Sequence, residues 1–286
     1  MSRTPDVAVV ITTFDVQDLL IRCLDSLDGA AGSLKIEVVV VDNGFCDGTW
    51  QMLLARKNVK AIRGSSELGF GCANNLGAVV TRAPLILFLN PDTELEERSI
   101  QVLAECLGSR LDVATVGPRL ILPSGRLDPA SSRNFPSPSS AIHRFLGAPR
   151  VVGFEIEKPY NTEEVATTGE REVDSVSGAC FLIRRTAFDA VGGFDQRYFM
   201  YGDDLDLHRR LADLGWRTLC VHEAHVTHWK RESSRQRPVR TRFEFYRSMW
   251  RYYHEHHAHE PWILRVLVSS AILVLGTGAV LRRLVH

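Results

Sequence analysis

Three aspartates, Asp203, Asp204 and Asp206, lie within four consecutive positions, where a leucine-rich segment predicts the start of a helix. The helix dipole favours carboxylates at that end, and one of them can serve as the N-cap. Three acids exceed what capping needs, and they follow the aromatic residues Phe199 and Tyr201. Partial burial and acidic neighbours both raise the pKa of a carboxyl group. We therefore expect this segment to hold a general base.

A second acidic position follows the apolar run Leu85–Leu89, in the sequence Asn90-Pro91-Asp92. A proline-stiffened turn after a buried strand can present Asp92 to a divalent ion. Hard oxygen ligands suit Mg²⁺ or Mn²⁺, held jointly by the protein and a substrate diphosphate. An aspartate in an ordinary turn has the same pattern, so the segment alone leaves both interpretations open.

A third polar group, Asp42-Asn43-Gly44, comes directly after the apolar run Ile36–Val41. Polar residues at the carboxyl end of a parallel strand line the crevice in which α/β proteins bind ligands. An aspartate there can accept hydrogen bonds from a nucleobase or a ribose. An ordinary turn at the end of a strand is the alternative.

A glycine turn at Gly69 and Gly71 opens another expected helix. Asn74 stands where a dinucleotide-binding fingerprint has its third glycine, and the chain contains no GxxxxGK phosphate loop. A dinucleotide-dependent oxidoreductase is therefore disfavoured. The turn can still offer backbone N–H groups to a phosphate or a sugar.

Histidines cluster twice toward the C-terminus. His222, His225 and His228 do not form the HExxH zinc motif, because Val226 stands at the position of its second histidine. One of the three could complete a metal site, although a single histidine is more often structural. The later histidines, within residues 254–259, are more typical of an interfacial or solvated face than of a metal site.

The elements that must position these side chains follow from the apolar runs. Val7–Thr12, Ile36–Val41 and Leu85–Leu89 are continuous apolar segments, typical of strands buried on both faces of a parallel sheet. Expected helices at Val16–Leu27 and Cys72–Thr81 alternate with them, which predicts an α/β fold. A strand is also expected at Trp216–Val221, and residues 123–140, rich in proline and serine, predict a long binding loop or lid.

Composition narrows the class of protein. The chain has 286 residues, 45% of them hydrophobic, with 34 basic and 34 acidic side chains. These values exclude a disordered acidic protein, a collagen-like chain and a generally basic nucleic-acid coat, so no nucleic-acid partner is expected. The six cysteines are far apart and form no CxxC pair, which argues against a zinc ribbon or a thioredoxin-type site.

The balanced charge is a cancellation, because residues 229–286 hold 11 basic and only 4 acidic side chains. This part ends in an uncharged run, Val266–Leu281, of 16 residues. At 1.5 Å per residue the run is about 24 Å long, shorter than the roughly 30 Å core of a bilayer. Trp262 and Arg265 precede it as interfacial anchors would. We expect a helix in or dipping into a membrane leaflet, with a core helix or a dimer-forming helix as alternatives.

In this order, the segments VVITTF, VVVDNG, ELGFGCANNLG, LFLNPD, GACFLIRR, GGFDQRYFMYGDDLDLHRRL and HVTHWK resemble the inverting family 2 glycosyltransferases. The likeness is greatest to the bacterial rhamnosyltransferase-like branch and covers about residues 7–230. It implies a GT-A fold, a Rossmann-like mixed sheet flanked by helices, over residues 1–228. Residues 229–286 would form a basic and apolar helical extension.

The resemblance also implies a donor site for a nucleotide-diphosphate sugar. Thr12 and Phe14 would line the nucleotide pocket, and Asp42 would bind the base of the donor. The remaining donor-site residues are expected to be Asn43, Gly69, Asn74 and Asn90.

The resemblance further implies a metal site and a base. Asn90 and Asp92 stand at the family's DxD-type motif, with Asp92 the expected ligand of Mg²⁺ or Mn²⁺ and His228 near the metal and diphosphate. Asp203 and Asp204 fall at the family's Glu-Asp pair, which makes Asp204 the expected base. Asn90 replaces the first acid of the metal motif, and Asp203 replaces the usual glutamate.

These expectations combine into one hypothesis. A metal neutralises the diphosphate leaving group while the base activates an acceptor hydroxyl, and a single displacement inverts the anomeric carbon. The expected reaction moves L-rhamnose from dTDP-rhamnose to a polyprenyl-diphosphate-linked saccharide at the cytoplasmic face of the cell membrane, with a homodimer possible. Another donor, such as UDP-galactose or UDP-N-acetylglucosamine, and a non-catalytic membrane scaffold are the alternatives.

Overall fold

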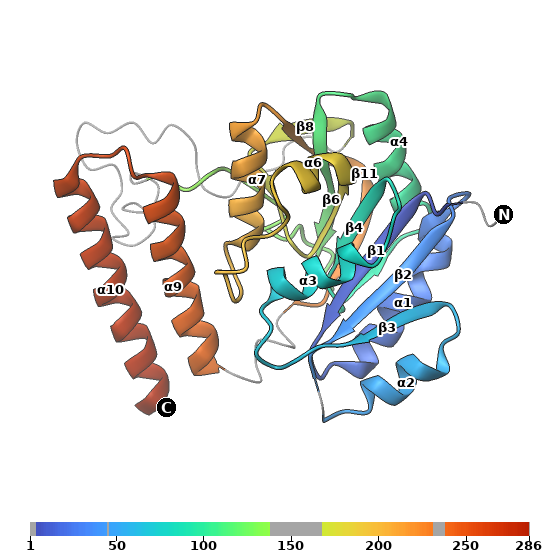
Figure 1. Ribbon diagram of the computed structural model, residues 1–286, viewed down its shortest axis with the longest axis horizontal. Coiled ribbons are helices and arrows are strands. Elements are labelled where there is room, and N and C mark those ends of the chain that lie inside the picture. The colour runs from blue at the N-terminus through green and yellow to red at the C-terminus, as the bar shows by residue number, and fades with distance from the viewer. Residues whose placement is uncertain (1–3, 45, 138–167, 231–237, 286) are drawn as a thin grey trace.

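The computed structural model describes residues 4–44, 46–137, 168–230 and 238–285 (Figure 1). Its centre is a nine-stranded mixed sheet with helices on both faces. The strands of the sheet are β1 (Val7–Thr13), β2 (Ile36–Asp42), β3 (Val59–Arg63), β4 (Leu85–Leu89), β5 (Thr93–Leu95), β6 (Val113–Ile121), β8 (Glu170–Val173), β10 (Cys180–Arg184) and β11 (Arg217–His228). A separate two-stranded ribbon consists of β7 (Ser132–Arg133) and β9 (Ser175–Val176). The α/β class expected from the sequence is confirmed.

The strand order is β3-β2-β1-β4-β10-β6-β11-β5, with β8 paired to β11. The first four strands are mutually parallel, β10 is antiparallel to both β4 and β6, and β6 is parallel to β11. Consequently β1, β2, β4, β6 and β11 all end at the same edge of the sheet.

Helices cover the two faces of this sheet and extend beyond it. They are α1 (Gln17–Ala31), α2 (Thr49–Ala55), α3 (Phe70–Val79), α4 (Ser99–Ser109), α6 (Arg185–Ala190), α7 (Asp203–Asp213), α9 (Pro238–His256) and α10 (Trp262–Val285). On β1, Val9 and Ile11 pack toward α1 and α4, whereas Val10 packs toward α3 and α6. All three side chains are fully buried. Burial on both faces explains why these strands are continuous apolar runs rather than alternating ones.

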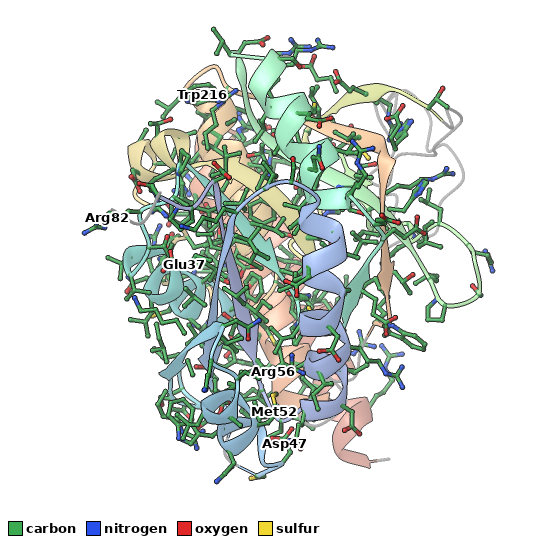
Figure 2. The ribbon with its side chains drawn as sticks, turned by 90° about the vertical axis from the view of Figure 1, so that its right-hand side faces the viewer. Glu37, Asp47, Met52, Arg56, Arg82 and Trp216 are labelled. Atoms are coloured by element: carbon green, nitrogen blue, oxygen red, sulfur yellow. The ribbon has the colours of Figure 1, made fainter. Side chains whose placement is uncertain are left out.

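The carboxyl ends of the strands meet at one end of the molecule. In the register of the sheet, Thr13 pairs with Asp42 and Ile11 pairs with Leu89, so the residues that follow these strands are neighbours. Asp47, from the loop after β2, lies at the opposite end of the molecule from Trp216, which directly precedes β11 (Figure 2). The carboxyl ends of the strands, where the sequence predicts the ligand site, therefore lie at the Asp47 end.

Two predicted segments differ from the structure. The strand expected at Trp216–Val221 continues to His228, because a bulge between Val221 and His225 lets β11 keep pairing with β6. The predicted long loop contains a short strand, β7, which pairs with β9 because Ser132 and Arg133 lie beside Ser175 and Val176. Residues 138–140 of that loop lie outside the described residues.

The C-terminal helices form a hairpin beside the main body (Figure 1). Tyr246, Met249 and Tyr253 of α9 pack against α10. The opposite side of α9 packs against the main body, where Tyr252 joins Tyr198 and Leu205 in a small apolar cluster. The division of the chain into two domains between residues 228 and 229 stays a prediction. Wherever the boundary lies, α9 packs against the main body.

Candidate active site

Asp42 is buried at the end of β2, where two groups hold its carboxylate. Nη1 of Arg63, at the end of the neighbouring strand β3, donates to Oδ2 at 2.5 Å, and the backbone N–H of Gly44 donates to Oδ1 at 3.0 Å. Burial raises the pKa of Asp42, and the hydrogen bond from Gly44 and the charge of Arg63 only partly oppose it. The sequence did not single out Arg63.

The loops after β1 and β2 are packed tightly together. A Cβ atom at Gly44 would lie 2.4 Å from Oδ1 of Asp15, so only glycine fits there. The same Oδ1 accepts the backbone N–H of Cys46 at 2.9 Å. Asp15 itself has a φ of 47°, a left-handed conformation that aspartate tolerates. This packing fixes the chain on both sides of Phe14, which is half-buried beside the Asp42 site.

Three buried oxygen atoms around the expected donor site have no hydrogen-bond partner within the described residues. They are Oγ1 of Thr12, Oδ1 of Asn43 and Oδ1 of Asn74. The amide nitrogen of Asn43 donates to the carbonyl of Leu68, and that of Asn74 donates to the carbonyl of Phe70. Leaving a buried acceptor unpaired costs about 1–3 kcal/mol, so a ligand donor that reached any of these oxygens would relieve that cost.

Gly69 allows two distant motifs to meet. A Cβ atom there would lie 2.3 Å from the carbonyl oxygen of Phe199, and that oxygen accepts the N–H of Phe70 at 2.7 Å. Asn75 exchanges two hydrogen bonds with the backbone of Phe194. The first N–H of α3 is thus used by the protein itself, and the glycine turn serves to dock the segment that leads to the acidic cluster.

The turn Asn90-Pro91-Asp92 is held from three sides. Thr93 Oγ1 donates to the carbonyl of Asn90 at 2.7 Å, and Cys23 Sγ lies 3.6 Å from the same oxygen. The backbone N–H of Asn90 donates to the carbonyl of Ala179, and the carbonyl of Asp92 accepts the N–H of Trp229. The turn therefore joins the ends of β4, β10 and β11 and fixes where Asp92 lies.

Asp92 faces His228, the histidine that the family resemblance places near the same metal. Nε2 of His228 lies 3.6 Å from Oδ1 of Asp92, and both side chains are about one-tenth exposed. Nδ1 of His228 lies 3.0 Å from Oδ2 of Asp128, whose other oxygen accepts Nζ of Lys230 at 2.6 Å. Asp128 is fully buried and was missed by the sequence analysis.

The charges of this group are balanced by close pairing. Burial alone would lower the pKa of His228, but its contacts with Asp128 and Asp92 outweigh burial and raise the pKa to about 9. Burial alone would raise the pKa of Asp128, but the hydrogen bonds from His228 and Lys230 hold it well below its usual range. The carboxylate of Asp128 thereby fixes the ring of His228 with Nε2 directed at Asp92.

The two acids at the start of α7 have opposite environments. Asp204 Oδ2 accepts Nη2 of Arg133 at 2.5 Å and the N–H of Gly178 at 2.8 Å, while Oδ1 accepts the N–H of Leu205. Burial would raise the pKa of Asp204, but Arg133 more than offsets it, and the pKa is lowered. Oδ2 of Asp203 is buried with no hydrogen-bond partner among the described residues. Burial and the charge of Asp204 raise the pKa of Asp203 to about 8.

The acidic pair is connected to the turn Asn90-Pro91-Asp92 through one short segment. Gly178 binds Asp204, and the next residue, Ala179, accepts the N–H of Asn90. One two-residue segment before β10 therefore connects the expected base to the turn that carries the expected metal ligand. Arg133, which reaches Asp204 from β7, was missed by the sequence analysis.

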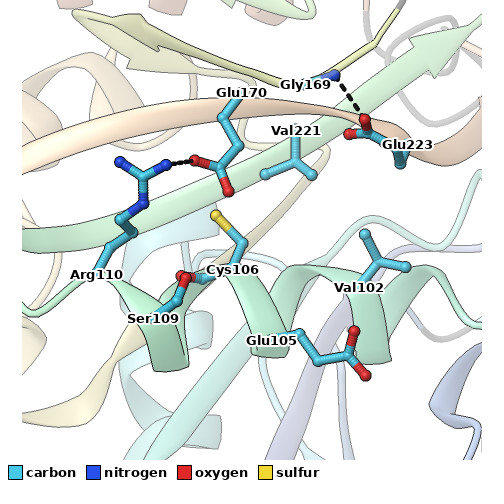
Figure 3. A pocket seen from close by; sticks show the side chains of 9 residues that line it. All are labelled: Val102, Glu105, Cys106, Ser109, Arg110, Gly169, Glu170, Val221 and Glu223. Atoms are coloured by element: carbon cyan, nitrogen blue, oxygen red, sulfur yellow. Dashed lines mark hydrogen bonds and ion pairs between the residues drawn. The ribbon is translucent and has the colours of Figure 1, made fainter.

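Two other features lie apart from this edge. A pocket of about 590 Å³ opens between α4 and strands β8 and β11, where Arg110 pairs with Glu170 and Glu223 accepts the N–H of Gly169 (Figure 3). It contains none of the predicted site residues. Side chains of His257, His259 and Glu260 come within 4.8 Å of one another on the connection between α9 and α10.

Comparison with known proteins decides the family. A family model described as glycosyltransferase like family 2 matches residues 5–247. The chain belongs to this family. It is therefore a glycosyltransferase, and its mixed sheet with flanking helices is the GT-A fold.

Named relatives of this family 2 glycosyltransferase include rhamnosyltransferases. It is 34% identical over 247 residues to an N-acetylglucosaminyl-diphospho-decaprenol L-rhamnosyltransferase of Mycobacterium tuberculosis, a match that covers 81% of this chain and 78% of the relative. It is 26% identical over 236 residues to a rhamnosyltransferase of Escherichia coli K12, covering 80% of this chain and 85% of the relative.

Solved structures with low sequence identity share the fold. A mannosyltransferase of Pyrobaculum calidifontis in complex with GDP-Man and Mn²⁺ superposes with a TM-score of 0.58 at 15% identity, covering 98% of this chain and 73% of that one. The structure of GalNAc-T7 with UDP, GalNAc and Mn²⁺ gives the same TM-score at 15% identity and covers 82% of this chain and 45% of that one.

Proposed function

We propose that this glycosyltransferase moves L-rhamnose from dTDP-rhamnose to a polyprenyl-diphosphate-linked saccharide, in the synthesis of a cell-wall or surface polysaccharide. The sugar is supported by both relatives named as rhamnosyltransferases. The acceptor is supported by the Mycobacterium tuberculosis relative, whose name specifies N-acetylglucosaminyl-diphospho-decaprenol. The observation that carries the proposal is that Asp42, Asp92 and Asp204 lie at the same edge of one sheet, joined by the contacts described above.

The donor nucleotide binds beside Asp42. The carboxylate of Asp42 accepts hydrogen bonds from the base, and Arg63 keeps it oriented from the next strand. The unpaired oxygens of Thr12, Asn43 and Asn74 support a ligand with several hydrogen-bond donors at this place. Phe14, Gly69 and Asn90 complete the donor site in this proposal.

Asp92 and His228 would hold a divalent metal, Mg²⁺ or Mn²⁺, which would displace the proton that Nε2 of His228 otherwise carries. The fit rests on Nε2 of His228, which is directed at the carboxylate of Asp92 because Asp128 takes the other ring nitrogen. Such an outer carboxylate is the usual device that orients a metal-binding histidine. When bound, the metal neutralises charge on the departing nucleotide diphosphate. Lys230 balances the charge of Asp128, so that the buried carboxylate stays ionised.

Asp204 is the base that deprotonates the acceptor hydroxyl. A base must be ionised at working pH, and Arg133 favours the ionised form of Asp204, whereas Asp203 is held in its protonated form near neutral pH. Attack by the acceptor oxygen on the face opposite the leaving diphosphate inverts the anomeric carbon in one displacement.

The C-terminal hairpin holds the enzyme at the cytoplasmic face of the membrane. The helix that spans Trp262–Arg282 has a mean hydropathy of 2.1, and only 17% of its most apolar window is buried. Its length of 21 residues, about 31 Å at 1.5 Å per residue, is enough to cross a bilayer. The continuous helix is longer than the uncharged run alone because Trp262–Arg265 belong to it.

An orientation within the plane of the membrane is favoured over a span. α9 lies along α10, with Tyr246 beside Gly276 and Tyr253 in the cluster with Val268. A spanning α10 would draw the exposed arginines of α9, Arg242 and Arg247, toward the hydrocarbon, at about 2.5–3.5 kcal/mol each. In the plane of the surface, the exposed apolar side chains of α10 enter the leaflet while arginines meet anionic headgroups.

A donor panel tests the reaction. The full chain, with Mn²⁺ or Mg²⁺ and a short-chain polyprenyl-diphosphate N-acetylglucosamine acceptor, is offered dTDP-rhamnose, UDP-galactose and UDP-N-acetylglucosamine. The proposal expects transfer from dTDP-rhamnose to exceed transfer from the other two donors at least tenfold. A preference for a UDP-sugar overturns the donor assignment, and no transfer from any donor overturns the proposed reaction.

A further inference from the structure

The third acid of the cluster, Asp206, contacts the C-terminal hairpin rather than the acidic pair Asp203 and Asp204. Nε2 of His256, the last residue of α9, lies 2.8 Å from Oδ1 of Asp206. Nε of Arg210 donates to the other oxygen, Oδ2, at 2.8 Å. The side chains of Asp206 and His256 are only 3% and 9% exposed. A carboxylate that already accepts from a guanidinium requires a donor at its second oxygen, so His256 donates through Nε2.

Asp206 lies in the same helical turn as Asp204. The backbone N–H of Asp206 donates to the carbonyl of Gly202, which closes the first turn of α7. A contact that fixes the side chain of Asp206 therefore also fixes the rotation and height of that turn. The carboxylate of Asp204 moves with it, because Oδ1 of Asp204 is bound to the N–H of Leu205 in the same turn.

The chain that enters this turn is strained and needs support. Tyr201 has a φ of 64° and Gly202 a φ of 74°, two left-handed residues in succession directly before the acids. A left-handed conformation is unfavourable for a non-glycine residue such as Tyr201, because its Cβ atom approaches the following carbonyl oxygen. Such a conformation persists only where the surroundings determine it.

α9 supplies that support at several points. Ser248 Oγ donates to the carbonyl of Met200 at 2.9 Å, directly before the strained pair. Nη1 of Arg197 lies 2.6 Å from Oε1 of Glu255, next to His256 on α9. The guanidinium of Arg240 lies 4.1 Å from the centre of the ring of Phe199. α9 thus contacts both the loop before the acids and the first turn of α7, which contains them.

We propose that His256 is a positioning residue of the transfer reaction, which acts through Asp206 to hold the first turn of α7 and so the carboxylate of Asp204. The role of Asp204 in this inference rests on the proposed function. His256 touches neither substrate nor the reacting atoms. The hairpin of α9 and α10 therefore helps to position the proposed base, because the last residue of α9 contacts the first turn of α7.

The test compares two histidines of α9. His256→Ala removes the donor to Asp206. His254→Ala is the matched control, because Nε2 of His254 lies 3.1 Å from Oγ of Ser269 in α10 and serves the hairpin alone. His256→Gln restores an N–H donor, and His256→Phe keeps the ring volume without a donor, in case the alanine variant is poorly folded. The melting temperature of each full-length variant is measured beside its activity.

Two readouts separate positioning from general stability. We expect kcat to fall about tenfold to a hundredfold in His256→Ala and His256→Phe, with the Kd for dTDP-rhamnose changed less than threefold. His256→Gln should recover most of kcat, and His254→Ala should keep it. Amide hydrogen exchange of residues 199–206 should speed up in the alanine and phenylalanine variants and stay unchanged in His254→Ala.

Unchanged kcat in His256→Ala and His256→Phe, or an equal loss in His254→Ala, overturns the inference. Faster exchange of residues 199–206 without any loss of kcat also overturns it, because the contact would then be structural alone. If the wild-type chain transfers no sugar from the donor panel, the proposed function fails. The exchange measurement then tests the inference by itself. Unchanged exchange of residues 199–206 in His256→Ala would show that the contact with Asp206 does not stabilise the first turn of α7.

Discussion

Arg133 and Asp204 form a buried ion pair, with Nη2 of the arginine 2.5 Å from Oδ2 of the aspartate and both side chains 11% exposed. They are 71 positions apart in the chain. Arg133 also donates to the carbonyl of Val176, which anchors the guanidinium on the β9 strand. The proposed base is thus kept ionised by a residue from a different part of the fold.

Arg133→Met should therefore change the pH dependence of transfer. Arg133 favours the ionised form of Asp204, so its removal raises the pKa of the base. The acid limb of the kcat profile should move to higher pH by about one to three units. Activity lost below neutral pH should return as the pH is raised, which a folding defect would not reproduce. Arg126→Met, an exposed arginine near Arg133 in the sequence, is the control. A profile unchanged from wild type would contradict the role of Arg133.

Asp203 gives a prediction about stability. Its pKa is about 8 in the folded chain and about 4 in an unfolded one, so between these values the folded state binds the extra proton. Because the unfolded chain ionises this carboxyl first, the free energy of unfolding falls as the pH rises above about 4. Asp203→Asn removes this titration, and its stability relative to wild type should increase from pH 5 to pH 8. Urea unfolding at the two pH values measures it, and a difference independent of pH would refute the assignment.

Asp128 should matter for metal affinity without touching the metal. It holds Nδ1 of His228 and so directs Nε2 at Asp92. Loss of such an outer contact typically weakens metal binding about 10–100-fold. We expect Asp128→Asn to weaken Mn²⁺-dependent binding of dTDP, measured by calorimetry, by this factor. Asp112→Asn, which removes an exposed acid, should bind as wild type does. Equal affinity in Asp128→Asn and wild type would argue against His228 as a ligand.

The sequence was sufficient to predict the edge of the sheet where the site lies. Runs such as Val7–Thr12 and Leu85–Leu89 are apolar throughout because they are buried on both faces. Parallel strands end together, so Asp42 at the end of β2 and Asp92 after β4 lie at the same edge of the sheet, on either side of β1. The same reasoning applied to His228 at the end of β11, although its strand is longer than predicted.

The partners of these residues could not be predicted in the same way. Arg133 and Asp128 lie in a polar segment rich in serine and proline, with no periodicity that indicates where it folds back. Asp128 and His228, which are in contact, are 100 positions apart in the sequence, and Asp206 and His256 are 50 positions apart. Such pairings depend on the three-dimensional course of loops, which local patterns of polarity do not encode. The cluster of acids could be recognised in the sequence. The lowered pKa of Asp204, however, depends on its contact with Arg133, which the sequence did not indicate.

The exposed face of α10 predicts binding to anionic vesicles. Leu267 and Val274 are 62% and 70% exposed, and burial of such a side chain contributes about 1.5–3 kcal/mol. Leu267→Ser with Val274→Ser should weaken cosedimentation with phosphatidylglycerol vesicles at least tenfold. Leu111→Ser, which changes an apolar residue of the main body that is even more exposed, at 82%, should have no effect. If the wild-type chain forms a stable dimer through α10 and does not cosediment with the vesicles, membrane docking is contradicted.

The most direct test of the account compares wild type with Asp204→Asn in two measurements on the same protein. One is the Kd for dTDP-rhamnose in the presence of Mn²⁺, and the other is kcat for transfer to the lipid-linked acceptor. A lost general base lowers the rate by about 10²–10⁴-fold, while the donor site around Asp42 is unaffected. We therefore predict a Kd within threefold of wild type and a kcat reduced at least a hundredfold. Transfer by Asp204→Asn within tenfold of the wild-type rate would contradict Asp204 as the base.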